Sequence, residues 1–553
     1  MNNLPKIFLE LANLFSDNGF NLYMVGGTSR DYLLNKEILD FDFATDATLE
    51  EMEKFLQINT SFSLLGSTTI NYNGNKVDIT TLRKEEGYYD SRHPSKVEFV
   101  KETALDYQRR DFTINAIYID KYGNIIDHCN GKKDLENQEI RMIGDVEKRM
   151  KEDPLRMLRA IRFSLILGFK LHDNIVEFIN TNKMVLRKIN FVKCAEEIEK
   201  MKLFSEKLAI NVLEKYEIDK VIPIEFNFKN PLNCIDMHCD SLTWELVEKN
   251  GFYENKEMHI DFKRLYKGEY LMQCFAVFMY YQRGDLYKNT LKYIDIFKRE
   301  MENNKNIISQ VTSYKELMDN KSKHKLSALL TIEEGGVIEG SIEKLEHLYS
   351  LGVRMICLTW NFKNEIGYPN LQRNLKETDY YKIDTVNGLT EFGIEVVKKM
   401  NELGIIIDTS HLSDAGFYDC IKYSKHPIVA SHSNSRRIHP YARNMTDDMI
   451  LKLHENKGVM GMNYCPDFVS ENTKENQIKD IVKHMLHIKE LGCIDNLALG
   501  SDFDGIETPV GMSDCTKTHE LREEMVRSGF TNDEIEKVFY KNFLRVFKQV
   551  CKK

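Results

Sequence analysis

The 553-residue chain lacks C-x-x-C pairs, long apolar runs and an excess of basic residues. Its 11 cysteines are scattered and odd in number, which excludes a disulfide framework and a zinc ribbon and is typical of a reducing compartment. A membrane-spanning helix needs ~18 consecutive apolar residues, and no apolar run approaches that length. The start, MNNLPKIFLELANLFSDNGF, places apolar residues at helical spacing and lacks the basic n-region of a secretory leader. These absences predict a soluble cytoplasmic protein.

The charges nearly balance. The chain carries 76 basic and 85 acidic residues, so a chain-wide polybasic surface is excluded, whereas a local basic groove is not. Hydrophobic residues make up 42% of the chain, enough for sizeable cores, and at ~100–200 residues per domain the length predicts two to four domains. A long helical stretch over 153–222 gives way to short apolar runs that alternate with amphipathic segments, a pattern typical of βα units. We therefore place a domain boundary between Ile224 and Asn233.

Near the N-terminus, a predicted strand over 22–25 runs into Gly26-Gly27 and then into a helix. Glycines there let the backbone approach a phosphate, although most Gly-Gly pairs are only turns. On a strand, Asp40 and Asp42 point to one face, and two adjacent carboxylates repel unless a cation such as Mg²⁺ neutralises them. Taken alone, an Asp-x-Asp pair is more often a solvated strand face. Asp78, on another alternating strand, could supply a third carboxylate.

Two further segments, 109–116 (RRDFTINA) and 152–163 (EDPLRMLRAIRF), combine basic and acidic residues. On a helix, Asp153 and Arg156 lie three residues apart on one face. A carboxylate beside a guanidinium can match the Watson–Crick edge of a base. Asp153 can equally be a helix N-cap with Pro154 at the first helical position, and both interpretations can hold together.

Taken in order, these motifs resemble the head and neck of the bacterial-type tRNA nucleotidyltransferase and poly(A) polymerase family. The similarity covers about residues 4–226 and includes Arg92-His93-Pro94 and the Ala44-Thr45 pair after Asp42. It implies a nucleotidyltransferase α/β head at 1–150, a helical neck at 151–226, and addition of ATP or CTP to the 3′ end of a tRNA-like RNA. It also implies catalytic Mg²⁺ at Asp40 and Asp42, and nucleotide contacts by Gly26, Gly27, Arg30, Arg110, Asp111, Asp153, Arg156 and Arg159. Ser29 replaces the family's usual valine, and the family's body and tail domains are missing after about residue 224.

In the second half, predicted strands repeatedly end in residues that can bind metal. Five such strands lead into the segments 236–240, 333–336, 408–411, 431–433 and 501–505. Further strands over 271–278, 354–358 and 459–463 bring the number of βα units to about eight. That number predicts a (β/α)₈ TIM-like barrel at 233–553, with its active site at the carboxyl ends of the strands.

The candidate ligands form a mixed nitrogen and oxygen set. His238 and Asp240 lie two apart on one strand and face one cavity. Together with His411, His432 and a carboxylate such as Glu334, they suit Zn²⁺. A single histidine is more often a hydrogen-bonded barrel residue. Five candidate ligands at strand ends favour a metal site.

The same half resembles the membrane (renal-type) dipeptidases from about Asn233 to Val550. The similarity includes GEYLMQCFA (268–276), LGVR (351–354), GLTEFG (388–393), ARNMTDD (442–448) and SDFDG (501–505). It implies a zinc dipeptidase that holds two Zn²⁺. His238 and Asp240 would bind one ion, His411 and His432 the other, with Glu334 as the bridge. Asp502 would be the catalytic acid and base, Arg443 would bind the terminal carboxylate of the dipeptide, and a homodimer would be one state of the protein.

Trp360 stands where animal-type members carry a histidine that helps to polarise the scissile carbonyl. The sequence thus leaves three hypotheses open. The first is a bifunctional fusion of nucleotidyltransferase and dipeptidase. The second is a dipeptidase whose N-terminal half is vestigial or binds RNA or nucleotides. The third is a metal-stabilised scaffold, which the retention of all five ligand candidates and Asp502 argues against, because buried charges are costly.

Overall fold

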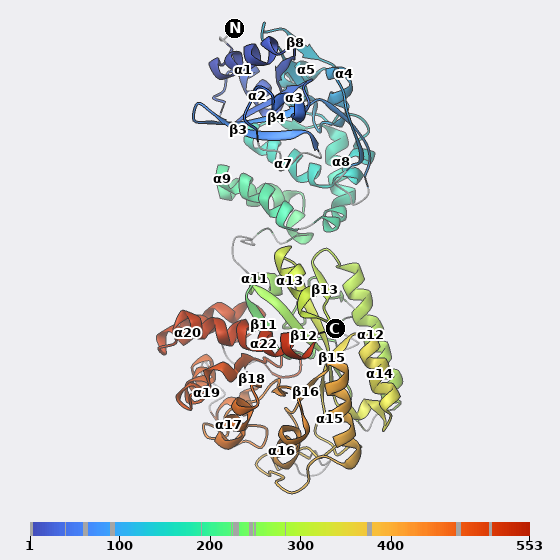
Figure 1. Ribbon diagram of the computed structural model, residues 1–553, viewed down its shortest axis with the longest axis vertical. Coiled ribbons are helices and arrows are strands. Elements are labelled where there is room, and N and C mark those ends of the chain that lie inside the picture. The colour runs from blue at the N-terminus through green and yellow to red at the C-terminus, as the bar shows by residue number, and fades with distance from the viewer. Residues whose placement is uncertain are drawn as a thin grey trace. The chain divides into compact units, whose positions relative to one another are not determined.

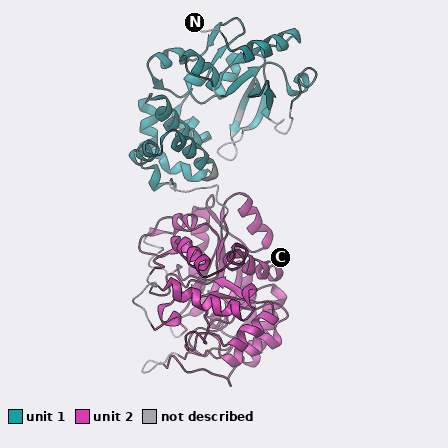
Figure 2. Ribbon diagram, turned by 90° about the vertical axis from the view of Figure 1, so that its left-hand side faces the viewer, with its two compact units in different colours: residues 1–224 teal, residues 225–553 magenta. Residues whose placement is uncertain are grey.

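The computed structural model describes residues 4–552 except 39, 59–64, 89–93, 190, 223, 225–231, 243–246, 248–249, 282–283, 373–378, 472–476 and 508–510. The chain divides into two compact units, residues 1–224 and 225–553 (Figure 2). Most of the expected boundary segment between Ile224 and Asn233, and Arg92-His93, lie outside the described residues. Within the described part of the chain, no helix is long and apolar enough to cross a membrane.

The first unit is built on a mixed sheet with the strand order β3-β4-β2-β1-β7-β8. β1 is antiparallel to both β2 and β7, whereas β2 is parallel to β4. Helix α1 covers this sheet because its apolar residues recur every three to four positions, which places Phe8, Leu11 and Phe15 on one fully buried face. The sheet elements are β1 (Leu22–Met24), β2 (Phe41–Thr45), β3 (Ser67–Tyr72), β4 (Asn75–Thr81), β7 (Ile117–Ile119) and β8 (Ile125–Asp127), with α1 at Lys6–Asp17 and α2 at Gly26–Leu33.

Helices follow this sheet toward the end of the unit. α7 (Leu155–Leu167) packs against α9 (Phe191–Lys215), and Gly168 ends α7 in the left-handed conformation that glycine adopts without strain. The remaining elements are α3 (Leu49–Met52), β5 (Arg83–Tyr88), β6 (Pro94–Phe99), α4 (Thr103–Asp106), α5 (Gly131–Glu136), β9 (Glu139–Ile140), α6 (Val146–Glu152), β10 (Lys170–Leu171) and α8 (Asp173–Asn182), with 3₁₀ turns at Tyr107–Arg109, Thr113–Asn115, Lys183–Lys188 and Ile218–Lys220.

The second unit is a closed barrel of eight described parallel strands, as the sequence predicted. β12 pairs with both β11 and β14, which closes the ring, and β13 (Ile308–Gln310) pairs with β14 as an additional strand. The barrel strands are β11 (Cys234–Asp236), β12 (Tyr270–Phe278), β14 (Leu326–Glu333), β15 (Val353–Cys357), β16 (Ile406–Asp408), β17 (Val429–Ala430), β18 (Val459–Met462) and β19 (Leu497–Leu499).

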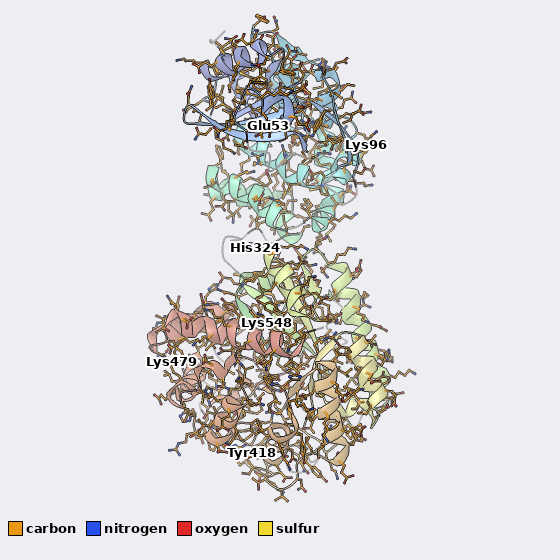
Figure 3. The ribbon with its side chains drawn as sticks, viewed as in Figure 1. Glu53, Lys96, His324, Tyr418, Lys479 and Lys548 are labelled. Atoms are coloured by element: carbon orange, nitrogen blue, oxygen red, sulfur yellow. The ribbon has the colours of Figure 1, made fainter. Side chains whose placement is uncertain are left out.

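Helices surround the barrel (Figure 1). They are α11 (Phe262–Lys267), α12 (Leu286–Asn303), α13 (Tyr314–Ser322), α14 (Ile342–Ser350), α15 (Glu391–Leu403), α16 (Asp414–Tyr423), α17 (Asp447–Glu455), α18 (Pro466–Val469), α19 (Ile478–Glu490), α20 (Thr518–Arg527), α21 (Asn532–Glu536) and α22 (Asn542–Val550), with short turns at Gly335–Ile338, Ile494–Asn496, Cys515–Lys517 and Lys537–Lys541. Charged side chains such as Lys96 and Lys479 lie at the periphery of their units (Figure 3). The polar residues that matter for chemistry are instead buried at the strand ends.

The barrel strands pack tightly where β17, β18 and β19 lie side by side. A Cβ atom on Gly500 would lie 1.8 Å from the carbonyl oxygen of Ser431, and one on Gly461 would lie 2.1 Å from the same oxygen. Only glycine fits at these two positions. This close approach brings the ends of β17 and β19 together, and those ends carry His432 and Asp502.

Candidate functional site

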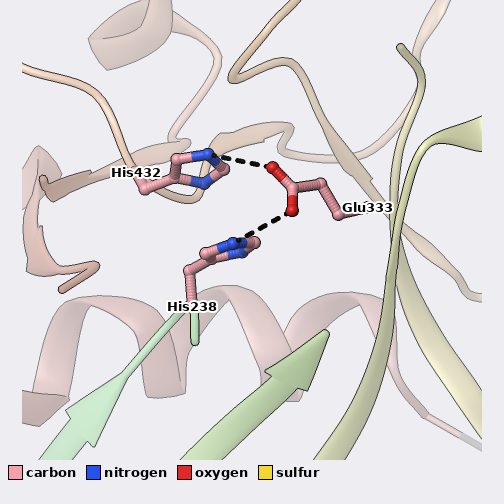
Figure 4. A group of neighbouring side chains, drawn as sticks. All are labelled: His238, Glu333 and His432. Carbon is pink, nitrogen blue, oxygen red and sulfur yellow. Dashed lines mark ion pairs between the residues drawn. The ribbon is translucent and has the colours of Figure 1, made fainter. Parts of the chain in front are cut away.

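A buried carboxylate and three imidazoles meet at the carboxyl ends of four barrel strands. Glu333, the last residue of β14, lies between His238 and His432, which follow β11 and β17 (Figure 4), and it also faces His411, which follows β16. Its Oε1 atom is 3.0 Å from His411 Nε2 and 3.6 Å from His432 Nε2, and its Oε2 atom is 3.5 Å from His238 Nε2. The strand ends thus bring together residues that are up to 194 positions apart in the sequence.

Two aspartates complete this cluster on the side of His238. Asp240 Oδ1 and Asp502 Oδ1 each lie 3.7 Å from His238 Nε2. The groups His238–Glu333–His432 and His238–Asp240–Asp502 each place one possible ligand atom per residue within 4.8 Å of the others. The structure therefore places five of the predicted residues, His238, Asp240, His411, His432 and Asp502, in one buried site.

Glu334 is the predicted ligand that the structure places elsewhere. Its Oε1 accepts hydrogen bonds from Gly336 N and Asn364 Nδ2, and its Oε2 accepts one from Trp360 N. The reason is the pleat: Glu333 ends the strand facing the barrel mouth, whereas Glu334 takes a positive φ of 108° and turns its carboxylate to these backbone and amide groups. Glu334, the predicted bridge, thus does not face the cluster, and the carboxylate that does is that of Glu333, which was not among the predicted ligands.

The hydrogen bonds of His411 and His432 fix the tautomers of both imidazoles. Asn361 Oδ1 accepts from His411 Nδ1 at 2.9 Å. His432 Nδ1 lies 2.7 Å from Ser431 Oγ, which in turn donates to the Asp408 carboxylate. Each Nδ1 therefore carries the proton, and each Nε2 presents a lone pair toward Glu333. The Nε2 atoms of His411 and His432 are also 3.0 Å apart. The lone pairs of these two nitrogens therefore face each other and the Glu333 carboxylate, and a bound cation would stabilise this arrangement.

The electrostatics of the cluster also fit a metal. Burial raises the pKa of Glu333 to about 8, with the Asp240 charge adding to it, and burial raises the pKa of Asp502 to about 6. Burial, followed by the nearby Arg443 and His238 charges, lowers the pKa of His411 well below its ordinary value, so its imidazole is neutral. Among the described residues, His238 Nε2, Asp240 Oδ1 and Glu333 Oε2 have no hydrogen-bond partner. Nitrogen and oxygen donors left open in this way are suited to a divalent metal.

Arg443 lies beside the two histidines. Its side chain is 3% exposed; Nη1 donates to Ser410 O, and Nη2 donates to His432 O at 3.1 Å and lies 3.3 Å from His411 Nε2. The predicted binder of a substrate carboxylate therefore points its guanidinium at the cluster.

In the first unit, the Gly-Gly turn and the Asp-x-Asp pair lie against each other. Gly27 N donates to Asp42 Oδ2 at 3.3 Å, and a Cβ atom on Gly26 would lie 3.1 Å from the same oxygen. Asp78 is the neighbour of Asp42 across β2 and β4. Burial raises the pKa of Asp42, and the Asp78 charge adds to this effect. Asp40 precedes β2 and is exposed, so the two aspartates differ in burial.

The predicted nucleotide-binding side chains are engaged in contacts within the unit. Arg30 Nη1 donates to Asn115 Oδ1 at 2.9 Å, and Arg159 Nη2 is 2.6 Å from Asp111 Oδ2. Asp153 Oδ1 accepts from Leu155 N, as a helix cap does, and Arg156 Nη1 donates to Arg149 O. The cap interpretation of Asp153 is thus visible, whereas base selection by Asp153 and Arg156 stays a prediction.

Arg110 belongs to a buried network around Asp106. Its Nε donates to Asp106 Oδ2 at 3.0 Å and to Tyr118 Oη at 2.9 Å, and Arg109 Nε donates to Asp106 Oδ1 at 2.7 Å. Burial opposes ionisation of Asp106, but the guanidinium groups of Arg110 and Arg109 outweigh it and hold the pKa of Asp106 well below its usual range. This carboxylate anchors the predicted nucleotide contact Arg110.

Replacing Asp106 by asparagine should lower the free energy of unfolding of the first unit by about 3 kcal/mol at pH 7, since the variant leaves buried guanidinium groups unpaired. Because the folded pKa lies below the unfolded value of about 3.9, the carboxylate stabilises above that pH and loses its effect as the pH falls. The difference between variant and wild type should therefore shrink toward pH 3. Urea unfolding of both proteins across this pH range measures the difference.

Glu147→Gln, which removes the charge of the exposed pair with Lys151, is the control and should cost under about 0.5 kcal/mol of stability. A loss of stability in Asp106→Asn that did not change with pH would contradict an ionised Asp106.

Family models match a part of each unit. The family model of the poly(A) polymerase head domain matches residues 22–141. The family model of the membrane dipeptidases, peptidase family M19, matches residues 228–553, more than half of the chain. The chain belongs to the membrane dipeptidase family.

Relatives of known sequence match the first unit of this membrane dipeptidase family member. The CCA-adding enzyme of Lactobacillus helveticus is 41% identical over 202 residues, which are 36% of this chain and 51% of that enzyme. The CCA-adding enzyme of Lactobacillus johnsonii is 42% identical over 206 residues, which are 36% of this chain and 52% of that enzyme. The chain thus spans about half the length of the curated relatives that it matches.

Solved structures share the fold of the dipeptidase unit. A metallo peptidase from Rhodobacter sphaeroides, liganded with a phosphinate mimic of the dipeptide L-Ala-D-Ala, superposes with a TM-score of 0.53 at 21% identity and covers 58% of this chain and 100% of that chain. A dipeptidase of family M19 gives a TM-score of 0.53 at 22% identity and covers 59% of this chain and 100% of that chain.

The dipeptidase site also contains supporting residues that the sequence motifs did not single out. Asp408, at the end of β16, accepts from Ser431, whose hydroxyl in turn binds His432 Nδ1. Asn361 holds His411 in the same manner from the segment after β15. Such partners orient metal-binding imidazoles. Their position directly after or at the end of a buried strand is the signal that could have found them.

Proposed function

We propose that the protein is a bifunctional fusion. Its barrel hydrolyses dipeptides with two Zn²⁺, and its N-terminal unit adds nucleotides to RNA 3′ ends with Mg²⁺. The observation that carries the first activity is the carboxylate of Glu333 between three imidazoles whose Nε2 atoms face it. Membership of the membrane dipeptidase family supports the same reaction.

In the barrel, His238 and Asp240 would hold one ion and His411 and His432 the other, with Glu333 between them. Bound zinc polarises a peptide carbonyl and lowers the pKa of the attacking water. Arg443 pairs with the terminal carboxylate of the dipeptide through its planar guanidinium. Asp502, with a pKa raised by burial to about 6, takes a proton from the water and delivers it to the leaving amine near neutral pH.

In the N-terminal unit, Asp40 and Asp42 would hold Mg²⁺, which neutralises the triphosphate. Gly26 and Gly27, at the start of α2, leave room for a phosphate next to Asp42. Arg159 lies close enough to Asp42 and Asp153 for their charges to act on it, and it would bind the triphosphate. Identity of 41% to a CCA-adding enzyme supports ATP or CTP and a tRNA-like RNA as substrates.

A second candidate function keeps only the dipeptidase active, with the N-terminal half as a vestigial or RNA- or nucleotide-binding module. Two observations favour it. The chain spans about half the length of its CCA-adding relatives. In addition, Asp106 and Tyr118 already occupy Arg110.

The test of the barrel is hydrolysis of a dipeptide panel, including L-Ala-D-Ala, by the zinc-loaded full-length protein. We expect about two zinc ions per chain and release of free amino acids. Removing zinc with a chelator should abolish hydrolysis, and adding zinc back should restore it. Absence of both bound zinc and hydrolysis after zinc addition would overturn the dipeptidase assignment.

A further inference from the structure

Four aromatic side chains form one wall beside the metal-ligand cluster. This aromatic wall consists of Phe278, Tyr280, Trp360 and Phe362. The ring centroids of Phe278 and Tyr280 lie 4.9 and 5.5 Å from that of Trp360, and the rings of Tyr280 and Phe362 are 5.1 Å apart. Edge and tilted contacts at these distances stabilise the group as a unit.

The wall comes from two strand ends that flank Glu333. Phe278 is paired in register with Glu333 across β12 and β14, so both side chains point to the same side of the sheet, at the barrel mouth. Trp360 follows β15, and its backbone N–H donates to Glu334 Oε2. Glu334, the carboxylate that does not face the cluster, therefore fixes the position of the wall.

The wall is partly exposed. Phe278, Tyr280 and Trp360 are of intermediate burial, whereas Phe362 is 8% exposed. Aromatic side chains of a barrel core are normally buried, and apolar surface next to a polar site gains free energy when a ligand covers it. Phe278, Tyr280 and Trp360 are therefore the part of the wall that a ligand can still cover.

Both Arg443 and the wall adjoin the His411 imidazole. Arg443 Nη2 approaches Nε2 of His411, whereas Asn361, the neighbour of Trp360, binds Nδ1 of the same ring. The Trp360 and His411 ring centroids are 6.2 Å apart. A dipeptide that placed its carboxylate on Arg443 would then extend past His411, with its amino-terminal residue toward the wall.

We infer that the aromatic wall is the subsite for the side chain of the amino-terminal residue of the dipeptide, and that it selects large apolar and aromatic side chains. The inference rests on the proposed dipeptidase function and names its substrate class. In an apolar subsite, each missing methylene costs about 10–200-fold in kcat/KM, so the preference over alanine is at least about tenfold.

The test compares Ala-Gly, Leu-Gly, Phe-Gly and Lys-Gly with the reversed dipeptides Gly-Ala and Gly-Phe, using the zinc-loaded full-length protein. In the wild type, kcat/KM for Phe-Gly should exceed that for Ala-Gly at least about tenfold. Trp360→Ala and Tyr280→Ala should each lower this ratio at least about threefold on the same reasoning, which is half of the effect in free energy. The ratio of Gly-Phe to Gly-Ala should change less than about twofold, because the wall does not face the carboxyl-terminal residue.

Because each ratio is measured within one protein, partial misfolding of a variant cancels. Trp360→Phe keeps an aromatic ring and should retain most of the preference. Tyr122→Ala removes an exposed ring of the first unit, 77% accessible, and should leave the ratio unchanged. An unchanged Phe-Gly to Ala-Gly ratio in Trp360→Ala, a preference for Lys-Gly, or a loss confined to Gly-Phe would overturn the inference while leaving the dipeptidase function intact. A wild type that hydrolyses none of the dipeptides would overturn the function itself.

Discussion

Replacing Glu333 by glutamine should remove bound metal and lower kcat/KM for dipeptide hydrolysis at least about 10³-fold, whereas the same change at Glu334 should leave the metal in place. Glu333 faces His238, His411 and His432, and an amide cannot supply the negative charge that offsets two cations there. Glu334 faces three N–H donors instead. An amide in its place sets one donor against another, which costs about 1–3 kcal/mol of stability but no metal ligand.

The two variants form a matched pair, because they make one chemical change at adjacent residues. Zinc content by atomic emission and hydrolysis of one dipeptide should be measured on both proteins, with thermal unfolding to follow stability. Glu333→Gln should lose zinc, and Glu334→Gln should mainly lower the unfolding temperature. The reverse result, with zinc lost only in Glu334→Gln, would place the bridge at the originally predicted residue.

The choice between Glu333 and Glu334 as the residue that faces the cluster could not be predicted from the sequence. The run Ile332-Glu333-Glu334-Gly335 identifies a strand that ends in carboxylates, and the closed barrel of parallel strands was predicted from such ends. Which of the two carboxylates points inward depends on where the pleat ends. That point is set by the positive φ of Glu334 and its hydrogen bonds to Trp360 and Asn364, which are made by a segment about 30 residues away. Tertiary contacts, not local pattern, decide it.

In the N-terminal unit, the order of the sequence motifs predicted the family resemblance. The sequence did not predict which side chains pair with one another. The structure places Gly27 against Asp42 and Arg159 against Asp111. Asp106 and Tyr118, which hold Arg110, lie outside the motifs, and Asn115, which holds Arg30, lies in the 109–116 motif but was not singled out there. Their roles follow from burial: an ionised group inside a protein must be paired, and its partner comes from whichever element lies nearest.

Replacing Asp42 by asparagine should abolish incorporation of labelled CTP or ATP into tRNA that lacks its 3′ end, with a loss of at least about 10³-fold, while dipeptide hydrolysis is retained. Asp42 and Asp78 face each other across neighbouring strands, and burial already disfavours the charge on Asp42. A bound divalent cation would offset the cost of burying the Asp42 charge, and it can bind only while residue 42 carries a carboxylate. The neutral amide relieves the repulsion, so the variant should fold at least as stably as the wild type while losing its Mg²⁺ ligand.

Asp46→Asn supplies the control, because Asp46 directly follows the other end of β2. Asp46 accepts hydrogen bonds from Asn21 rather than from the Gly-Gly turn, so this variant should keep incorporation. Incorporation that persists in Asp42→Asn would show that the metals are held elsewhere. A wild type that hydrolyses dipeptides but incorporates no nucleotide would favour the second candidate function, in which the N-terminal unit is vestigial or only binds RNA or nucleotides. In that case Arg110 would stay paired with Asp106 and would not bind a triphosphate. The Mg²⁺-dependent assay thus separates the two functions proposed for the N-terminal unit, which spans about half the length of its CCA-adding relatives.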